Sequence, residues 1–385
     1  MSANKSNEII VKDSDDAVGK ALVFVIGSSR CKIGFASEDR PRYEIVSVVG
    51  RLKEPDLIKE FLPKDIDVFM CDDAHSKKEI VNLEFPIERG IVTNWRDMEH
   101  IWHHAFYTKL QIPPEDQPIL LTEIPLNPKA NRDRMMAMML NEFLCPAVYV
   151  MTEPVLVMYS TGNLTGCVLD IGDSISIASC VIEGELIHHS SIIVNFGGID
   201  LTKYLMDLLK TRKQRRLEQE IEPEIIQDMK ECCCYTAKDL RREIEIAKDT
   251  TDTVIYYELP DGNSICLNDE RFQCPEALFN PELTGREELS IIKMVVHSIT
   301  ANSLQIRPNL ISNIALSGGS SMFQDLDERL KSELIKVFPE HEVHIIQSSN
   351  RKNGAWVGGS ILASLATFQS MWITKESFGG TKKKS

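Results

Sequence analysis

The sequence predicts an α/β fold of two lobes, and three observations support this prediction. The chain has 385 residues, which is too long for one ordinary core and suits two lobes of roughly 150–200 residues each. Short apolar runs alternate with helical patterns, as in other α/β architectures. Three apolar runs lead into small residues, at 27–29, 172–174 and 318–321. Small residues let backbone N–H groups approach phosphate oxygens, so this pattern indicates nucleotide binding.

The first half of the chain begins with a polar and charged segment, residues 1–20, for which we predict a loose N-terminal arm. The apolar runs 21–26 and 33–36 flank a small-residue turn and predict a buried hairpin. Residues 51–68 mix charges, prolines and scattered aliphatics, which indicates an irregular excursion. Further along, the patterns predict helices at 95–110 and 129–144 and short strands at 117–123 and 147–151.

The second half continues the α/β style without detectable self-similarity. A second strand–turn unit at 166–177 and a third at 313–322 contain the other two small-residue turns. Between them, residues 210–231 have a highly charged pattern typical of a helix. Helices are predicted again near 355–373, and we expect the final residues TKKKS to be disordered.

The composition argues against several classes of function. A net charge of −14 and a pI near 5.2 disfavour direct nucleic-acid binding, which needs a basic face. No segment approaches the roughly 18 apolar residues of a membrane span, and the beginning MSANKSNEII lacks the apolar region of a signal peptide. The ten cysteines show no C-x-x-C spacing, which favours free thiols in a reducing compartment. We therefore expect a cytoplasmic or nuclear protein without a membrane span.

Few side chains are candidates for metal chemistry on their own pattern. Asp170 ends the strand before the second small-residue turn, where it could hold a metal-bound water or merely cap the turn. The pairs His103–His104 and His188–His189 have no metal-ligand partners at usable spacing, so we interpret them as structural.

Seven segments closely resemble the actin family. They are GIVTNW at 90–95, IWHH at 101–104, LLTE at 120–123, PLNPKANR at 125–132, YELPDG at 257–262, RFQCPEALF at 271–279 and GGSILASL at 358–365. The likeness covers about residues 21–373. It implies an actin-like, two-lobed ATPase fold in which duplicated α/β domains surround an interlobe cleft. That cleft is expected to bind ATP or ADP with a divalent metal ion, Mg²⁺ or Ca²⁺.

The resemblance also implies how the chain divides. A first actin-like lobe is expected at 21–160, with the irregular loop at about 51–68 and with the chain returning to this lobe at 355–373. A second actin-like lobe is expected at 161–354, followed by a flexible tail at 374–385.

Matching positions imply a set of site residues. Asp170 is expected to hold the metal through water and, with Glu153, to be the candidate for catalysis. Lys32 stands where the family has a phosphate-contacting lysine, although a solvated lysine is the alternative. The implied nucleotide-binding residues are Gly27, Ser28, Lys32, Gly172, Asp173, Gly198, Lys230, Glu231, Gly318, Gly319, Met322 and Lys352.

Three departures from the actin pattern fall on the chemistry. Val25 stands where the family has an aspartate that supports the hydrated metal ion, and Ile177 stands in place of a histidine. Glu153 replaces the glutamine that orients the attacking water. Alternatively, its charge serves the N-terminus of the apolar helix that follows Pro154. These replacements predict a weakened metal site and weak or no ATP hydrolysis.

The surfaces used for assembly in the family depart as well. In actin filaments an apolar tip packs across the two strands, and in this chain the corresponding segment is Leu283–Arg286. Arg286 would therefore bring a charge to a pocket of a neighbouring subunit that favours apolar groups. Arg89 replaces a modified histidine, and Glu185 replaces an aromatic residue. We therefore expect a divergent actin-like cytoskeletal protein that serves as a structural subunit of a filament or multiprotein assembly.

The partners of such a subunit would be proteins, either conventional actin or a larger cytoskeletal complex. Two alternatives remain open. The first is a nucleotide-cycling, polymerising ATPase. The second is a nuclear actin-related subunit of a chromatin-remodelling complex, for which the basic stretch 210–216 is the only indication.

Overall fold

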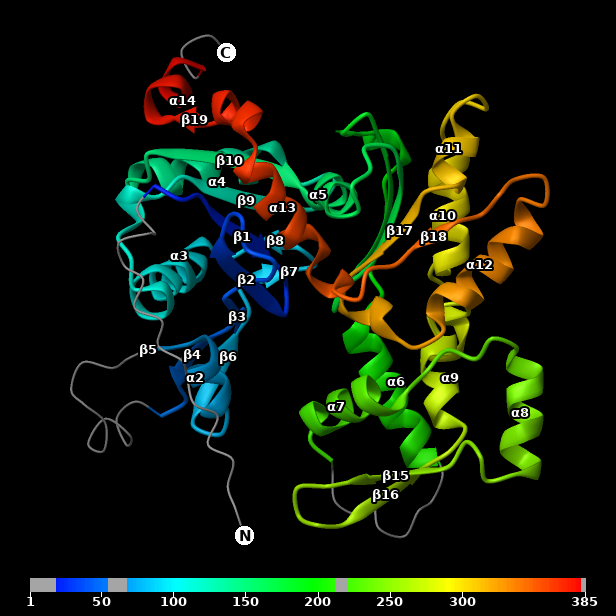
Figure 1. Ribbon diagram of the computed structural model, residues 1–385. Coiled ribbons are helices and arrows are strands. Elements are labelled where there is room, and N and C mark those ends of the chain that lie inside the picture. The colour runs from blue at the N-terminus through cyan, green and yellow to red at the C-terminus, as the bar shows by residue number, and fades with distance from the viewer. Residues whose placement is uncertain (1–18, 55–67, 212–220, 382–385) are drawn as a thin grey trace.

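The structure, a computed structural model that describes residues 19–54, 68–211 and 221–381, contains two large mixed β-sheets surrounded by helices (Figure 1). The two sheets lie in different halves of the molecule and repeat one arrangement. In each, an antiparallel hairpin is extended, on the side of its first strand, by two parallel strands. This duplicated α/β architecture confirms the predicted fold class.

The first sheet has the strand order β19-β10-β9-β1-β2-β3. Its strands are β1 (Leu22–Ile26), β2 (Arg30–Phe35), β3 (Tyr43–Val46), β9 (Ile119–Glu123), β10 (Ala147–Thr152) and β19 (Ile373–Thr374). Helices α3 (Trp95–His103) and α4 (Lys129–Asn141), with a π-helical turn at His104–Leu110, cover one face of this sheet. Every residue of β1 is buried because both faces of the sheet are covered, which explains its continuous apolar sequence.

The second sheet has the strand order β13-β12-β11-β17-β18, and β14 pairs with β12. Its strands are β11 (Gly166–Ile171), β12 (Ser176–Ile182), β13 (Glu185–Leu186), β14 (Ile192–Val194), β17 (Ile314–Ser317) and β18 (Ile345–Ile346). Helices α6 (Gly198–Thr211), α10 (Ile291–Thr300) and α12 (Leu326–Val337) share one large core with this sheet.

Two helices, α5 (Glu153–Ser160) and α13 (Gly354–Ser364), lie between the sheets and share a core with residues of both. The chain passes from the first sheet to the second through α5 and returns through α13. Their backbones touch, because a Cβ added to Gly358 would lie only 1.7 Å from the carbonyl oxygen of Leu156. This pair of helices therefore sets how the two halves sit against each other.

A smaller unit lies at the far end of each half (Figure 1). The unit in the first half comprises α2 (Cys71–Ser76), β4 (Val49–Leu52), β5 (Val68–Met70) and β6 (Val81–Glu84), and the one in the second half comprises α7 (Pro223–Cys233), α8 (Leu240–Asp249), β15 (Ile255–Glu258) and β16 (Ser264–Leu267). The remaining elements are β7 (Ile87–Glu88), β8 (Ile91–Val92), α9 (Glu270–Glu276), α11 (Arg307–Ile311) and α14 (Lys375–Thr381).

Two predicted segments in the middle of the chain need correction. Arg51 and Leu52 do not belong to the expected irregular loop but to β4, because Leu52 is buried in the core of the small unit. Residues 55–67 of that loop lie outside the described residues.

The charged stretch 210–231 is not described as one helix, since a new helix, α7, begins at Pro223, a residue suited to the first turn of a helix. Residues 212–220 between these parts also lie outside the described residues.

The expected tail needs correction too. Residues 375–381 form α14 rather than a flexible segment, and Phe378 packs against the core of the first half. Residues 1–18 of the expected N-terminal arm and residues 382–385 of the tail are not among the described residues.

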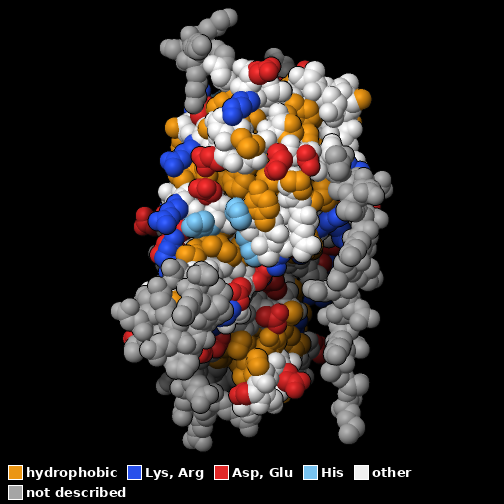
Figure 2. Space-filling model, turned by 90° about the vertical axis from the view of Figure 1, so that its left-hand side faces the viewer, with side chains coloured by type: hydrophobic (Ala, Val, Ile, Leu, Met, Phe, Trp, Pro, Cys, Tyr) orange, Lys and Arg blue, Asp and Glu red, His pale blue; other side chains and the backbone are white. Residues whose placement is uncertain are grey.

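The surface and the helices bear on where the chain can act. Among the described residues, no helix combines the length and the apolar character needed to cross a membrane. Figure 2 shows acidic and basic side chains interspersed among hydrophobic ones on one face of the molecule, without a continuous basic field.

Candidate functional site

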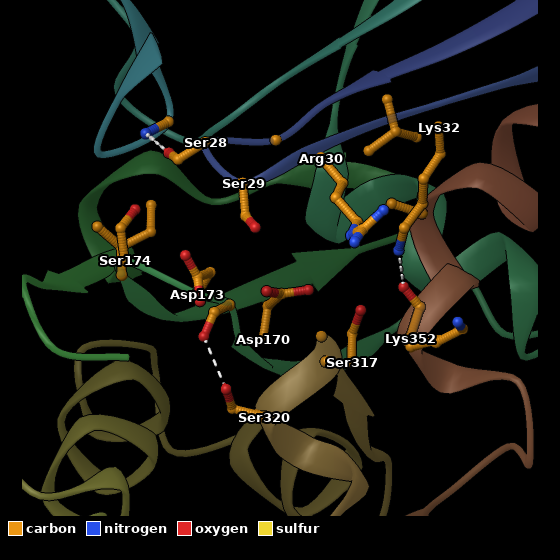
Figure 3. Close-up of a pocket in the computed structure, with 18 of the residues that line it drawn as sticks. Ser28, Ser29, Arg30, Lys32, Asp170, Asp173, Ser174, Ser317, Ser320 and Lys352 are labelled. Atoms are coloured by element: carbon orange, nitrogen blue, oxygen red, sulfur yellow. Dashed lines mark hydrogen bonds between the residues drawn. The ribbon is translucent and has the colours of Figure 1, made fainter. Parts of the chain in front are cut away.

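A cavity of about 460 Å³ lies between the two halves of the molecule (Figure 3). Its volume falls in the range of small-molecule sites, roughly 300–1,000 Å³. It is lined by the turn between β1 and β2, the turn between β11 and β12, the glycines after β17 and the segment before α13. The three small-residue turns singled out in the sequence therefore meet at one site.

The first turn is shaped by Gly27 and anchored to the body of the first half. A Cβ on Gly27 would lie 2.5 Å from the carbonyl oxygen of Arg30, so a larger residue does not fit. The hydroxyl of Ser28 accepts a hydrogen bond from the backbone N–H of Gly90 at 2.8 Å. Ser47 donates to the carbonyl oxygen of Gly27 at 2.7 Å. Both Gly27 and Ser28 line the cavity.

The second turn is bonded to the segment that follows β17. The hydroxyl of Ser320 donates to the carbonyl oxygen of Gly172 at 3.0 Å, a bond drawn in Figure 3. Gly318 has a φ of 88°, and a Cβ there would lie 2.3 Å from the carbonyl oxygen of Ile171, so conformation and space both require glycine. The residues of these two segments that line the cavity include Gly172, Asp173, Gly318, Gly319 and Met322.

Of the other residues expected to bind the nucleotide, Lys230 and Glu231 line the cavity and Gly198 does not. Lys230 is only 4% exposed. Its ammonium group donates to the carbonyl oxygen of Gly198 at 2.8 Å and to Oγ1 of Thr202 at 2.9 Å. Gly198 thus begins α6 behind this lysine and holds its ammonium group, rather than facing the cavity itself.

Lys32 and Lys352 also line the cavity and are linked to each other. The ammonium group of Lys32 donates to the carbonyl oxygen of Lys352, as Figure 3 shows. The ammonium group of Lys352 lies 3.3 Å from a carboxylate oxygen of Glu44. Burial lowers the pKa of Lys32, against the effect of the negative charges of Glu44 and Asp170. Lys32 is therefore a cavity residue held by the fold, not a freely solvated lysine.

Glu153 is placed for both roles considered from the sequence. It is the first residue of α5, which suits a charge at a helix N-terminus, and it also lines the cavity, which suits a role in the nucleotide site. Its carboxyl group accepts a hydrogen bond from Oγ1 of Thr122 at 3.1 Å, and the same Oγ1 accepts one from the N–H of Ile26 at 3.1 Å. Burial, followed by the negative charge of Asp170, raises the pKa of Glu153 to about 8, although Thr122 and Lys32 act in the opposite direction. Its surroundings therefore favour the protonated form of the carboxyl group over the ionised form.

A divalent cation fits these side chains poorly. Burial raises the pKa of Asp170, while Ser317 and Lys32 lower it. The surroundings of the neighbouring Glu153 favour its neutral form, and Val25 lines the cavity with a side chain that has no oxygen atom. Within the described residues, no group of three or more His, Cys, Asp or Glu side chains is placed to hold a metal ion. Hard cations such as Mg²⁺ and Ca²⁺ prefer several oxygen ligands, so this donor set is a weak one.

Arg30 also lines the cavity, although it was not among the residues expected there. The sequence pattern assigned it to the first turn, whereas it is the first residue of β2. Side chains alternate along a strand, so Arg30 and Lys32 share a face while Cys31 between them is buried. This alternation of side chains is the sequence pattern from which Arg30 could have been placed in the cavity beside Lys32. Glu44, the cross-strand neighbour of Lys32, had no such signal because it lies on a separate strand.

The family model for actin matches residues 16–382 of the chain. The match therefore includes both sheets, the two helices between them and all the segments that line the cavity. The chain belongs to the actin family.

Proposed function

We propose that this chain binds ATP or ADP in the cavity between its halves and serves as a structural subunit of a cytoskeletal filament or multiprotein assembly, with weak or no ATP hydrolysis. Membership of the actin family supports an adenine nucleotide and a cytoskeletal role in general terms. One contrast within the cavity carries the finer proposal. The turns suited to backbone contact with phosphates are assembled, whereas the positions expected to serve the metal and the attacking water hold the apolar side chains of Val25 and Ile177 and a carboxyl group, Glu153, whose neutral form is favoured by burial.

The proposal of slow hydrolysis follows from what phosphoryl transfer requires. Catalysis of this reaction consists mainly of positioning the attacking water and stabilising charge. Val25 and Ile177 line the cavity, and their side chains contain only carbon atoms, so neither can orient the attacking water or a metal-bound water. Burial favours the neutral form of the Glu153 carboxyl group at the position expected to orient that water. The loss of one supporting group around a metal site typically reduces affinity or activity about 10–100-fold.

Bound nucleotide can be tested directly. Chromatography of the small molecules released from the purified protein should detect ATP or ADP in stoichiometric amount. Adding millimolar ATP to the emptied protein should raise its melting temperature, because a ligand of the folded state stabilises that state. An empty protein that gains no thermal stability from ATP, with or without magnesium, contradicts nucleotide binding.

Hydrolysis needs a separate measurement. In a single-turnover phosphate-release assay, the wild type should release phosphate much more slowly than conventional actin measured alongside. The double change Val25→Asp with Glu153→Gln should be faster than the wild type if the lost groups cause the slow reaction. A wild-type rate equal to that of actin would favour the nucleotide-cycling alternative instead.

The proposed partners are proteins, either conventional actin or a larger cytoskeletal complex, and the proposed location is the cytoplasm. The net charge of −14 and the interspersed charges in Figure 2 support protein partners over nucleic acid. The nuclear alternative depends on the basic stretch 210–216, most of which lies outside the described residues. Identification of what co-purifies with the native protein distinguishes the two, since subunits of chromatin remodellers would favour the nuclear alternative.

A further inference from the structure

Four cationic side chains line the cavity: Arg30, Lys32, Lys230 and Lys352. The three lysines are engaged by carbonyl, hydroxyl or carboxylate oxygens of the protein itself. The guanidinium group of Arg30, by contrast, makes no hydrogen bond or ion pair with any residue that the structure describes. Arg30 is therefore the cation of this cavity that remains available to a ligand.

The position of Arg30 on β2 directs it into the cavity. Arg30 is exposed, and the next residue, Cys31, is buried on the other face of the strand. Lys32 lies on the same face as Arg30, with its Cα about 7 Å further along the strand. In Figure 3 the Arg30 side chain extends into the cavity on the side where Lys32 and the carboxyl group of Asp170 lie.

The chemistry of a guanidinium group favours phosphate as its partner. Its planar fork of N–H donors matches phosphate oxygens and forms two parallel, charge-assisted hydrogen bonds. Residues of the turns at 27–29 and 172–174 line the same cavity, and backbone N–H groups of such turns are suited to bind phosphate oxygens. The N–H of Gly172 is the exception, because it donates to the carbonyl oxygen of Ile175 at 2.9 Å. A fixed positive charge here also repels a divalent cation, at a site where Val25 supplies no oxygen ligand.

We propose that Arg30 binds the phosphate groups of the nucleotide directly and supplies the positive charge that a divalent cation would otherwise supply, so that this chain binds ATP or ADP without a metal ion. This inference rests on the proposed nucleotide binding and adds a specific residue and a specific ionic requirement to it. It also gives a physical reason why the metal-supporting oxygen at position 25 is dispensable.

Calorimetric titration of ATP into the nucleotide-depleted full-length protein tests the proposal, in a buffer with magnesium and in one with EDTA. The wild-type Kd in EDTA should lie within about threefold of the Kd in magnesium. In Arg30→Met, ATP should bind about 10–100-fold more weakly in EDTA, as expected for the loss of charge-assisted hydrogen bonds. Magnesium should restore part of that loss in the variant, and Arg30→Lys should bind with intermediate affinity.

Arg40→Met is the matched control, because Arg40 is exposed outside the cavity and the change in net charge is the same. Its Kd should equal that of the wild type in both buffers. Melting temperatures without nucleotide show whether each variant is folded, which is expected because Arg30 is exposed and unpaired among the described residues.

Each remaining outcome contradicts a separate statement. Wild-type protein that binds ATP in magnesium but not in EDTA overturns metal-free binding and leaves nucleotide binding standing. Equal affinities of the wild type and Arg30→Met in EDTA overturn the role of Arg30. Absence of binding in both buffers overturns nucleotide binding itself, and this inference with it.

Discussion

The carboxyl group of Glu153 lies where the first sheet, helix α5 and the cavity meet. It is hydrogen-bonded to Thr122, which is in turn bonded to the backbone of Ile26 beside the first turn. Burial and the nearby charge of Asp170 favour its neutral form. The carboxyl group of Glu153 therefore adds less negative charge to the cavity than its residue type suggests.

This residue predicts a definite pH dependence for the nucleotide-free protein. In the unfolded chain Glu153 ionises near its ordinary value of 4.5, whereas in the folded protein its pKa is about 8. Between these values the folded state binds more protons than the unfolded state, so the contribution of Glu153 to the free energy of unfolding falls as the pH rises. That contribution is fully present below pH 4.5 and lost above about pH 8.

The variant Glu153→Gln isolates this effect, because the amide stays neutral and can still accept the hydrogen bond from Thr122. Its melting temperature relative to the wild type should increase between about pH 5 and about pH 8. Glu282→Gln is the control, since Glu282 is exposed on the surface, and it should follow the wild type. Parallel curves for the wild type and Glu153→Gln would show that the carboxyl group is not buried as described.

At the scale of secondary-structure elements, the pair α5 and α13 joins the two halves. The close contact at Gly358 allows the backbones of the two helices to touch. The segment GGSILASL was recognised in the sequence only as a family resemblance. The structure supplies its physical reason, because any side chain at this position would have to displace the backbone of α5.

We therefore predict that Gly358→Ala destabilises the protein by about 3 kcal/mol, the upper part of the usual range for overpacking. The added Cβ would lie 1.7 Å from the carbonyl oxygen of Leu156, and backbone cannot yield as a flexible side chain can. Gly354→Ala in the same helix meets no atom closer than 3.5 Å and should change stability by less than about 1 kcal/mol. Urea unfolding midpoints measure both, and equal midpoints for the two variants would contradict the described helix contact.

At the scale of the whole molecule, the tip Leu283–Arg286 behaves differently from what the sequence suggested. Arg286 was expected to present an unpaired charge to a neighbouring subunit. Instead, its Nη2 lies 2.6 Å from Oδ1 of Asp200, and its Nη1 donates to the carbonyl oxygen of Asn195 at 2.9 Å. In the isolated chain the charge of Arg286 is therefore paired, and the tip is bonded to its own half of the molecule.

We predict that the purified protein does not form long homopolymers. A tip held by Asp200 is not free to fill an apolar pocket on a neighbouring subunit, and Glu185, which is exposed, brings a charge to a position where the resemblance to actin implies an aromatic contact. Under conditions that polymerise conventional actin, pelleting and negative-stain microscopy should show monomers or small oligomers. Abundant two-stranded filaments of the purified protein would refute this. Incorporation into, or capping of, a conventional actin filament is compatible with it.

The sequence by itself determined the fold class and the three small-residue turns, and its resemblance to the actin family led us to expect replacements at Val25, Glu153 and Ile177. These depend on residue types in local runs, and the runs shared with the actin family are long. Only the tertiary structure decided which side chains meet: Glu153 with Thr122, Lys230 with Gly198, Arg286 with Asp200, and Arg30 with an open cavity. The physical reason is that a local pattern specifies an element and its buried face, whereas pairing, burial and pKa depend on residues that packing brings together from distant parts of the chain.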